Sequence, residues 1–382
     1  MSKILLIGVS VRALAESAVK SGYPVIALDA FGDSDLENLC EVYSLSRDFQ
    51  IPYSARGLFL ASQELKFDGF SYTSNLENHP AVVQDFSRSA LTLGNPPEVL
   101  RRARHWPGFY SFLSQNGYLV PVTLFSDDFP IDGKDRQWLI KPVRSGGGQH
   151  ISFWKPGRKI RPGFMLQEYI PGKSCSASFI SNGIEAVVIG ITEQIIGVPI
   201  PDGRNFFYRG NILPLDNMAN PVQANRILAQ VQQAAALLTR EFRLVGMNGI
   251  DFILAGENIY ITELNPRYCA SMELIERAYN IPVFDLHYRA VTRGELQAFR
   301  LEDTGTATGR YIAKSILYAD RDCCAPDTRG WFARGIRDIP HSGETLRKNK
   351  PVCTIFAEGN SRDECLSNLT KATKNIEMEI YG

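Results

Sequence analysis

Short apolar runs alternate with amphipathic stretches over the first hundred residues. This alternation predicts an α/β fold, an open parallel sheet with helices on both faces. The predicted elements are strands at Ile4–Ile7, Val25–Leu28 and Gly69–Thr73 and helices near residues 12–20, 55–65 and 80–90. Because ligands of such sheets bind beyond the carboxyl ends of the strands, Gly8–Arg12 and Ser74–Glu77 occupy candidate binding positions. Ser10 and Arg12 could hold a carboxylate there, or could simply cap the following helix.

The pattern changes after about residue 96, where a helical stretch is followed by longer strands and hairpin signals. This change predicts an α+β region. Its predicted elements are strands at Phe164–Ile170, Ser174–Ile180 and Ala186–Ile196, helices near Val222–Phe242, Ser271–Ala278 and Val283–Val291, and a β-rich terminal piece with a helix near Arg362–Ile376. We therefore expect three domains, at residues 1–105, 106–300 and 301–382, the second with a small lobe at about 120–172 and a large lobe at about 173–300.

Composition and charge argue against several classes of protein. The chain has 382 residues, 44% of them hydrophobic, and its 41 Lys and Arg balance its 41 Asp and Glu. A neutral chain has no general field that attracts nucleic acid or an anionic membrane, and no apolar run is long enough to span a bilayer. The apolar start breaks at Gly8, which is typical of a first strand and not of a signal peptide. We expect a cytoplasmic protein that binds neither nucleic acid nor membrane.

The seven cysteines support this expectation. They are odd in number and show no CxxC spacing, which favours free thiols in a reducing compartment over a disulfide or zinc framework. Cys269 lies two residues after Arg267, close to the most distinctive segment of the chain. It could act as a nucleophile, although a buried structural thiol is the simpler interpretation.

That segment consists of two apolar strands joined by Gly256-Glu257-Asn258. A three-residue loop would place Asp251 opposite Glu263, with Asn265 on the same face. Two carboxylates and an amide oxygen suit Mg²⁺, which leaves its other positions to water and phosphates, and Arg267 adds a cation for a phosphate oxygen. The alternative is an exposed hairpin with solvated acids, but the flanking strands are too apolar for a freely solvated ribbon.

A glycine-rich loop is a candidate phosphate-binding flap. Ser145-Gly146-Gly147-Gly148 lies four residues after Lys141, and successive glycines can bring backbone N–H groups close to phosphate oxygens. The loop lacks the ending of a Walker motif, and a glycine-rich hairpin turn is the alternative. Further along, Gln167–Gly172 ends a strand. Glu168 in this segment could accept a hydrogen bond from an adenine amine, or the segment could be an ordinary strand end.

Taken in order, these segments resemble the ATP-grasp superfamily of carboxylate–amine and carboxylate–thiol ligases. The matching stretches are IKPVRSGGG, QEYIPG, GIDFIL and TELNPR. The likeness implies an N-terminal parallel-sheet domain, two ATP-clasping lobes over residues 120–295, and a small C-terminal β-rich piece. That last piece is similar to the one in biotin carboxylase and in the purine-biosynthesis carboxylase ATPase subunit. The chain is most similar to a group of predicted ATP-dependent carboligases.

The resemblance implies roles for the residues that match its motifs. Phosphate contacts fall to Lys141, Ser145, Gly146, Gly147 and Gly148. Adenine contacts fall to Gln167, Glu168, Tyr169 and Ile170. The implied metal ligands are Asp251, Glu263 and Asn265, and Arg267 steadies the reacting phosphate. Two positions depart from the family pattern. Ser174 stands where many members bind ribose with an acidic residue, and only Arg101, Arg102 or Arg104 could supply a second basic residue before the central domain.

We call the two predicted strands that carry Asp251 and Glu263 the acidic hairpin. The acceptor pocket for the substrate carboxylate and amine is expected between this hairpin and the strand ends of the first domain. Its candidate residues are Arg12, Glu77, Arg209 and the residues after Arg267. We expect Arg209 to be catalytic, because it lies in a polar loop that could close over a carboxylate substrate, although a solvated loop is the alternative.

The resemblance also implies the reaction. ATP and Mg²⁺, or Mn²⁺ in its place, would serve to convert a substrate carboxylate into an acyl phosphate. An amine would then attack, with release of ADP and phosphate. The implied partners are a small-molecule carboxylate and an amine, and a homodimer is common among relatives. Three alternatives would use the same nucleotide site: a bicarbonate-dependent carboxylase, a small-molecule kinase, and an ATP-binding regulatory protein without turnover.

Overall fold

A five-stranded parallel sheet forms the N-terminal region of the computed structural model, which describes residues 3–125, 136–157, 159–197, 206–215, 221–298 and 310–382. The strands are β1 (Ile4–Ile7), β2 (Val25–Asp29), β3 (Glu41–Ser44), β4 (Gly69–Tyr72) and β5 (Leu91–Thr92), in the order β3-β2-β1-β4-β5. The helices are α1 (Arg12–Lys20), α2 (Ser34–Glu37), α3 (Ala55–Ser62) and α4 (Pro80–Ser87), with a 3₁₀ turn η1 (Leu76–Asn78) after β4.

This arrangement confirms the predicted α/β fold of the first hundred residues. Besides the 3₁₀ turn η1, three elements were not predicted: β3, α2 and the two-residue strand β5. β3 is a partly exposed edge strand without an apolar run, and α2 has only four residues, so neither leaves a periodic signal. The strand order reverses between β1 and β4, which is where ligands of open parallel sheets bind.

A small antiparallel sheet follows two helices, α5 (Pro97–Ala103) and α6 (Trp106–Gln115). Its strands are β6 (Thr123–Leu124), β7 (Trp138–Pro142), β8 (Ser152–Phe153) and β9 (Phe164–Glu168), in the order β6-β9-β7-β8. The glycine-rich loop connects β7 to β8, so the predicted flap lies at one end of this sheet.

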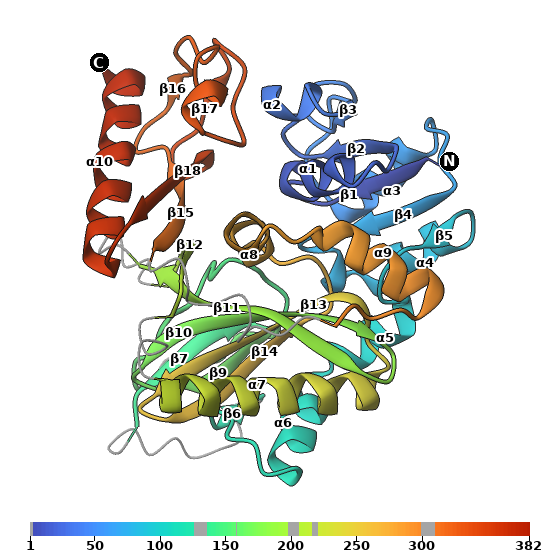
Figure 1. Ribbon diagram of the computed structural model, residues 1–382, viewed down its shortest axis with the longest axis vertical. Helices are drawn as coiled ribbons and strands as arrows, with labels where there is room; N and C mark the ends of the chain where they lie inside the picture. The colour runs from blue at the N-terminus through green and yellow to red at the C-terminus, as the bar shows by residue number, and fades with distance from the viewer. Residues whose placement is uncertain (1–2, 126–135, 158, 198–205, 216–220, 299–309) are drawn as a thin grey trace.

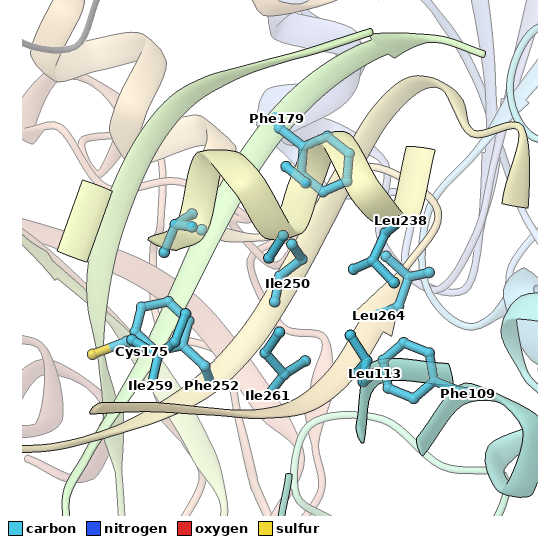
Figure 2. Packing of buried hydrophobic residues seen from close by; sticks show 14 of the residues in the cluster. Phe109, Leu113, Cys175, Phe179, Leu238, Ile250, Phe252, Ile259, Ile261 and Leu264 are labelled. Atoms are coloured by element: carbon cyan, nitrogen blue, oxygen red, sulfur yellow. The ribbon is translucent and has the colours of Figure 1, made fainter. Parts of the chain in front are cut away.

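A seven-stranded antiparallel sheet occupies the centre of the molecule (Figure 1). Its strands, in spatial order, are β14 (Asn258–Asn265), β13 (Val245–Ala255), β10 (Lys173–Asn182), β11 (Ala186–Ile196), β12 (Tyr208–Leu213), β15 (Tyr311–Tyr318) and β18 (Pro351–Gly359). The long helix α7 (Pro221–Phe242) lies along one face of the sheet. Figure 2 shows Leu238 of α7 packed with Ile250 and Phe179 of the sheet, part of a core that also takes Phe109 and Leu113 from α6.

Two further helices, α8 (Ser271–Tyr279) and α9 (Val283–Arg293), separate the large sheet from the N-terminal sheet (Figure 1). Their apolar residues share one buried cluster with α1: Leu14 of α1 packs in the same core as Ile275 of α8 and Phe284 of α9. The N-terminal region is thus held against the large sheet by a continuous hydrophobic core, which positions the carboxyl ends of its strands over the acidic hairpin.

The C-terminal residues extend the large sheet. β15 pairs with β12 and β18 pairs with β15, so the predicted β-rich piece contributes its two long strands to the central sheet. The remaining elements are a small ladder of β16 (Cys323–Cys324) and β17 (Thr345–Leu346), the 3₁₀ turn η4 (Phe332–Arg334), and the terminal helix α10 (Arg362–Tyr381). All seven cysteines have free thiols. Among the residues described, no helix is both long and apolar enough to cross a membrane.

Candidate active site

Asp251 and Glu263 face each other across the hairpin of β13 and β14. Asn265 follows Glu263 on β14, and its amide Nδ2 donates to Asp251 Oδ2 at 3.0 Å. The two carboxylates and the amide therefore come together as the sequence pattern predicts. Burial, and then the neighbouring Glu263 carboxylate, raise the pKa of Asp251 to about 6. A bound cation would relieve this repulsion between like charges.

The turn of the hairpin differs from the predicted one. The strands pair directly across Gly256-Glu257, so the predicted three-residue loop is wrong. Gly256 has a φ of 64°, as a two-residue hairpin turn requires. A β-bulge beside Asp251, with Thr262 as the extra residue, restores the pairing of Asp251 with Glu263. Thr262 Oγ1 donates to the Asp251 carbonyl at 3.0 Å and so closes the bulge.

Lys141 on β7 approaches the two carboxylates from the small sheet. Its Nζ donates to Gln167 Oε1 at 2.9 Å, and Gln167 in turn donates to the Tyr110 hydroxyl at 2.8 Å. Burial lowers the pKa of Lys141, while the charges of Glu263 and Asp251 oppose that shift. The ammonium group is therefore held by a buried amide within electrostatic range of both acids.

The glycine-rich flap lies between the N-terminal sheet and β12. Gly146 lies close to the N-terminal sheet: a Cβ added at this position would be 3.3 Å from Oγ of Ser74, which follows β4. Gly147 and Gly148 have φ angles of 64° and 73°, conformations that favour glycine. A Cβ on Gly148 would lie 1.7 Å from the carbonyl oxygen of Phe206, so only glycine allows this close approach.

The predicted adenine and ribose residues lie where β9 ends and β10 begins. Glu168 pairs with Val122, accepting a hydrogen bond from its backbone nitrogen at the carboxylate Oε2, 3.2 Å away. Tyr169 and Ile170 follow and are half-buried. Ser174 on β10 lies opposite β13 in the large sheet. The roles of these residues toward a nucleotide stay predictions.

Arg267 links the hairpin to the N-terminal sheet. Its Nη2 donates to Asn265 Oδ1 at 2.9 Å and lies 3.0 Å from Oε1 of Glu77. Burial alone would lower the pKa of Arg267, but the charges of Glu77, Cys269 and Glu263 and the hydrogen bond to Glu77 together outweigh it, and the pKa is raised. Glu77, an expected acceptor-pocket residue, is fully buried and compensates this cation.

Of the three arginines considered before the central domain, Arg104 reaches the acidic hairpin. Its Nη1 donates to Glu263 Oε1 at 2.6 Å, whereas Arg101 and Arg102 make exposed contacts with α4 and α7. Burial raises the pKa of Glu263, but Arg104 and Lys141 together lower it overall. The two acids of the hairpin thus differ: Glu263 has cationic partners, and Asp251 has amide partners.

One of those amides carries no recognisable sequence signal. Gln194 on β11 donates from Nε2 to Asp251 Oδ1 at 3.1 Å. β10 separates β11 from β13 in the sheet, so the side chain reaches Asp251 across an intervening strand. Only the pairing of distant strands brings Gln194 to the site, and no local motif in the sequence indicates that pairing.

Two other candidate residues, Arg209 and Arg12, lie apart from the acidic hairpin. The Arg209 guanidinium lies 5.9 Å from the ring centroid of Tyr318 on β15, so the structure does not bring this predicted catalytic residue to the cluster. Residues 198–205 of its predicted loop lie outside the described residues. Arg12 is buried and bonds carboxylates of the protein itself. Cys269, in contrast, lies beside Gly249 of β13 and accepts a contact from Arg267 Nη1 at 3.7 Å. Burial raises the pKa of the Cys269 thiol to about 12, which makes it a poor nucleophile.

A parallel-sheet domain, a small sheet with a glycine flap, and a large antiparallel sheet with an acidic hairpin define an ATP-grasp architecture. Residues 108–271 match the family model of the ATP-grasp domain. Residues 108–271 therefore carry an ATP-grasp domain, which confirms the resemblance seen in the sequence motifs.

Relatives extend the likeness over nearly the whole chain. An uncharacterized protein of Methanocaldococcus jannaschii is 25% identical over 388 aligned residues, which cover 94% of this chain and 88% of that protein. The L-amino acid ligase of Bacillus licheniformis has a similar structure, with a TM-score of 0.68 and 16% identity over 100% of this chain and 98% of the ligase. A biotin carboxylase of Campylobacter jejuni has a TM-score of 0.71 and 12% identity, over 97% of this chain and 91% of the carboxylase.

Proposed function

We propose that this chain is an ATP-dependent ligase that activates a substrate carboxylate as an acyl phosphate and joins it to an amine. The observation that carries the proposal is the meeting of Asp251, Glu263 and Asn265 with three cations. These are Lys141 of β7, Arg104 at the end of α5 and Arg267 directly after β14. Acids and cations held together at the end of a glycine flap suit a bound polyphosphate and its metal ion.

The donor set fits Mg²⁺. Asp251 and Glu263 are hard carboxylate donors that face each other, and Asn265 adds an amide oxygen. Within the described part of the chain, no group of three or more Asp, Glu, His or Cys is arranged to hold a metal by itself. A set of two carboxylates and an amide matches an ion that takes its remaining ligands from water and phosphate. When bound, Mg²⁺ would offset phosphate charge.

The residues of the chain would bind and orient the reacting groups. Lys141 and Arg267 would offset the charge that develops on the phosphoryl oxygens, and the flap would offer backbone N–H groups. A carboxylate oxygen of the substrate would attack the γ-phosphorus, and the bond to the leaving ADP would break. The amine nitrogen would then attack the acyl carbon, displace phosphate and release its proton. No protein nucleophile is required, in agreement with the buried, weakly acidic Cys269 thiol.

The test is ATP consumption with product identification across pooled amino acids and, separately, bicarbonate. The matched pair of variants is Glu263→Gln and Glu257→Gln, two acids of the same hairpin, of which Glu257 is exposed at the turn. We expect ADP and phosphate to appear only with a substrate pool. We expect Glu263→Gln to lose about 10²-fold or more in turnover and Glu257→Gln to behave as the unmodified protein.

The same assay separates the competing functions. Bicarbonate-dependent turnover would identify a carboxylase, and a phosphorylated product without an amide would identify a kinase. Formation of AMP and pyrophosphate would contradict the acyl-phosphate mechanism. Saturable ATP binding without turnover on any pool would favour a regulatory protein.

A further inference from the structure

The turn η1 places two buried polar residues at the carboxyl end of β4. Glu77 is 0% exposed and Asn78 is 4% exposed. Both belong to the N-terminal domain, yet the side-chain contacts that hold them are with arginines outside this sheet. Among the described residues, Oε2 of Glu77 and Nδ2 of Asn78 have no hydrogen-bond partner, and Oε1 of Glu77 has only the ion pair with Arg267. Buried polar groups without partners are rare and call for an explanation.

Glu77 begins one line of contacts into the proposed metal site. Its Oε1 lies 3.0 Å from Arg267 Nη2, and the same Nη2 donates to Asn265 Oδ1 at 2.9 Å. The amide of Asn265 then donates to Asp251 Oδ2 at 3.0 Å. Glu77 therefore compensates the cation that orients Asn265, and Asn265 in turn orients Asp251.

Asn78 begins a second line of contacts, which runs through Arg104 to Glu263. Its Oδ1 accepts a hydrogen bond from Arg104 Nε at 3.0 Å, and Arg104 Nη1 donates to Glu263 Oε1 at 2.6 Å. The guanidinium is further held over the ring of Trp106, 4.5 Å from its centroid. Adjacent residues of one turn thus hold the two arginines that contact Asn265 and Glu263 of β14.

We propose that Glu77 and Asn78 are positioning residues for the metal–nucleotide site, an inference that rests on the proposed function. A buried ion pair is weak evidence for stability, because desolvation of both charges offsets their attraction. Outer partners that orient metal ligands typically change metal affinity 10- to 100-fold when removed. The N-terminal domain would therefore complete the nucleotide site, so that the acids reach their working geometry only when this domain is docked.

The experiment measures ADP affinity by isothermal titration calorimetry, with and without Mg²⁺, for the full-length chain. The variants are Glu77→Gln, which removes one charge at nearly constant size, and Asn78→Ala, which breaks the second line. Arg101→Gln is the matched control, because Arg101 lies on α5, just before Arg104, but makes an exposed contact with Gln84 of α4. Glu77→Asp tests whether a restored charge rescues binding.

We expect Glu77→Gln and Asn78→Ala to bind MgADP about 10- to 100-fold more weakly and to bind metal-free ADP as the unmodified protein does. We expect Glu77→Asp, which keeps the charge at this position, to bind MgADP more tightly than Glu77→Gln. Unchanged MgADP affinity in both variants would overturn the positioning role. If Glu77→Gln does not fold, as its thermal melt would show, Asn78→Ala alone decides. Failure of the proposed function looks different: the unmodified protein would then bind ADP no more tightly with Mg²⁺ than without it.

Discussion

At the scale of single residues, His287 shows how burial alone sets a protonation state. It lies on α9, accepts a hydrogen bond from Met247 N at Nδ1 (3.0 Å), and its Nε2 lies 3.2 Å from the Leu93 carbonyl oxygen. Burial lowers the pKa of His287 to about 4, and the bond to Leu93 opposes this only in part. The ring is therefore neutral in the folded protein and joins the large sheet to the N-terminal domain.

His287 makes stability depend on pH. The unfolded chain binds a proton at this site below about pH 6.5, whereas the folded protein binds one only below about pH 4. The free energy of unfolding should therefore fall as the pH drops from about 6.5 to 4, by up to about 3 kcal/mol from this residue. Urea unfolding midpoints at pH 5 and pH 7.5 measure the effect.

The control for this prediction is His287→Gln, which keeps an acceptor and a donor but does not titrate. Asp29 acts in the opposite direction, because burial raises its pKa to about 6 and the folded protein then binds its proton first. The difference between the two proteins isolates the histidine. An equal loss of stability at low pH in both would show that His287 is not responsible.

How well the contacts of the candidate site could be predicted depends on how far apart along the chain the contacting residues lie. Asp251, Glu263 and Asn265 can be predicted from the sequence, since all three lie within one hairpin and on one of its faces. Arg104 could only be narrowed to three neighbouring arginines, because its contact with Glu263 depends on how α5 packs. Gln194 could not be predicted at all, since its contact with Asp251 requires the register of non-adjacent strands.

At the scale of elements, the prediction for the acidic hairpin gives the correct pairing of Asp251 with Glu263 but the wrong turn. A three-residue loop and a two-residue turn followed by one β-bulge give the same partner for Asp251. The apolar alternation specifies which face of the hairpin each residue occupies, so it predicts that Asp251 and Glu263 lie on the same face. It does not specify where the extra residue lies, because the bulge at Thr262 depends on the Thr262 hydroxyl bonding the Asp251 carbonyl.

The flap offers a test of a single close contact. Gly147 and Gly148 both have positive φ angles, so alanine strains the backbone at either position. Only at position 148 would a Cβ also collide with a neighbour, the carbonyl oxygen of Phe206. We expect Gly148→Ala to raise the KM for ATP about tenfold more than Gly147→Ala, since overpacking costs about 1–3 kcal/mol. Equal effects of the two variants would contradict the importance of this contact.

At the scale of the whole molecule, the parallel sheet could be predicted because its strands and helices follow one another locally. The number and order of strands in the central sheet could not be predicted. β15 pairs with β12 and β18 pairs with β15, and each partner lies far away along the chain. A run of apolar residues near the C-terminus predicts strands but does not indicate which edge they join. The prediction of a β-rich C-terminal piece is therefore compatible with the structure without describing its pairing.

Arg12 connects the three regions of the molecule. Its guanidinium donates to Glu273 of α8 at 2.5 Å, to Asp338 of the C-terminal region at 3.0 Å, and to Glu16 of α1 at 3.0 Å. The side chain is 1% exposed, so the carboxylates it contacts are largely shielded from water. The arginine at the end of β1 does hold carboxylates, but they belong to the protein.

Removal of Arg12 should therefore loosen the assembly of all three regions. Arg12→Met removes this cation from Asp338 and leaves Glu273 with Lys314, 3.1 Å away, as its remaining close partner. Breaking a buried pair costs about 3–5 kcal/mol when a charge is left uncompensated, so we expect a loss at or below the lower end of that range. The thermal or urea midpoint should fall accordingly. Arg88→Met is the control, because the pair of Arg88 with Asp85 is exposed to solvent and contributes little. If both variants unfold at the same midpoint, the buried network does not hold the regions together. If only Arg12→Met unfolds early, and in separate steps, the network couples them.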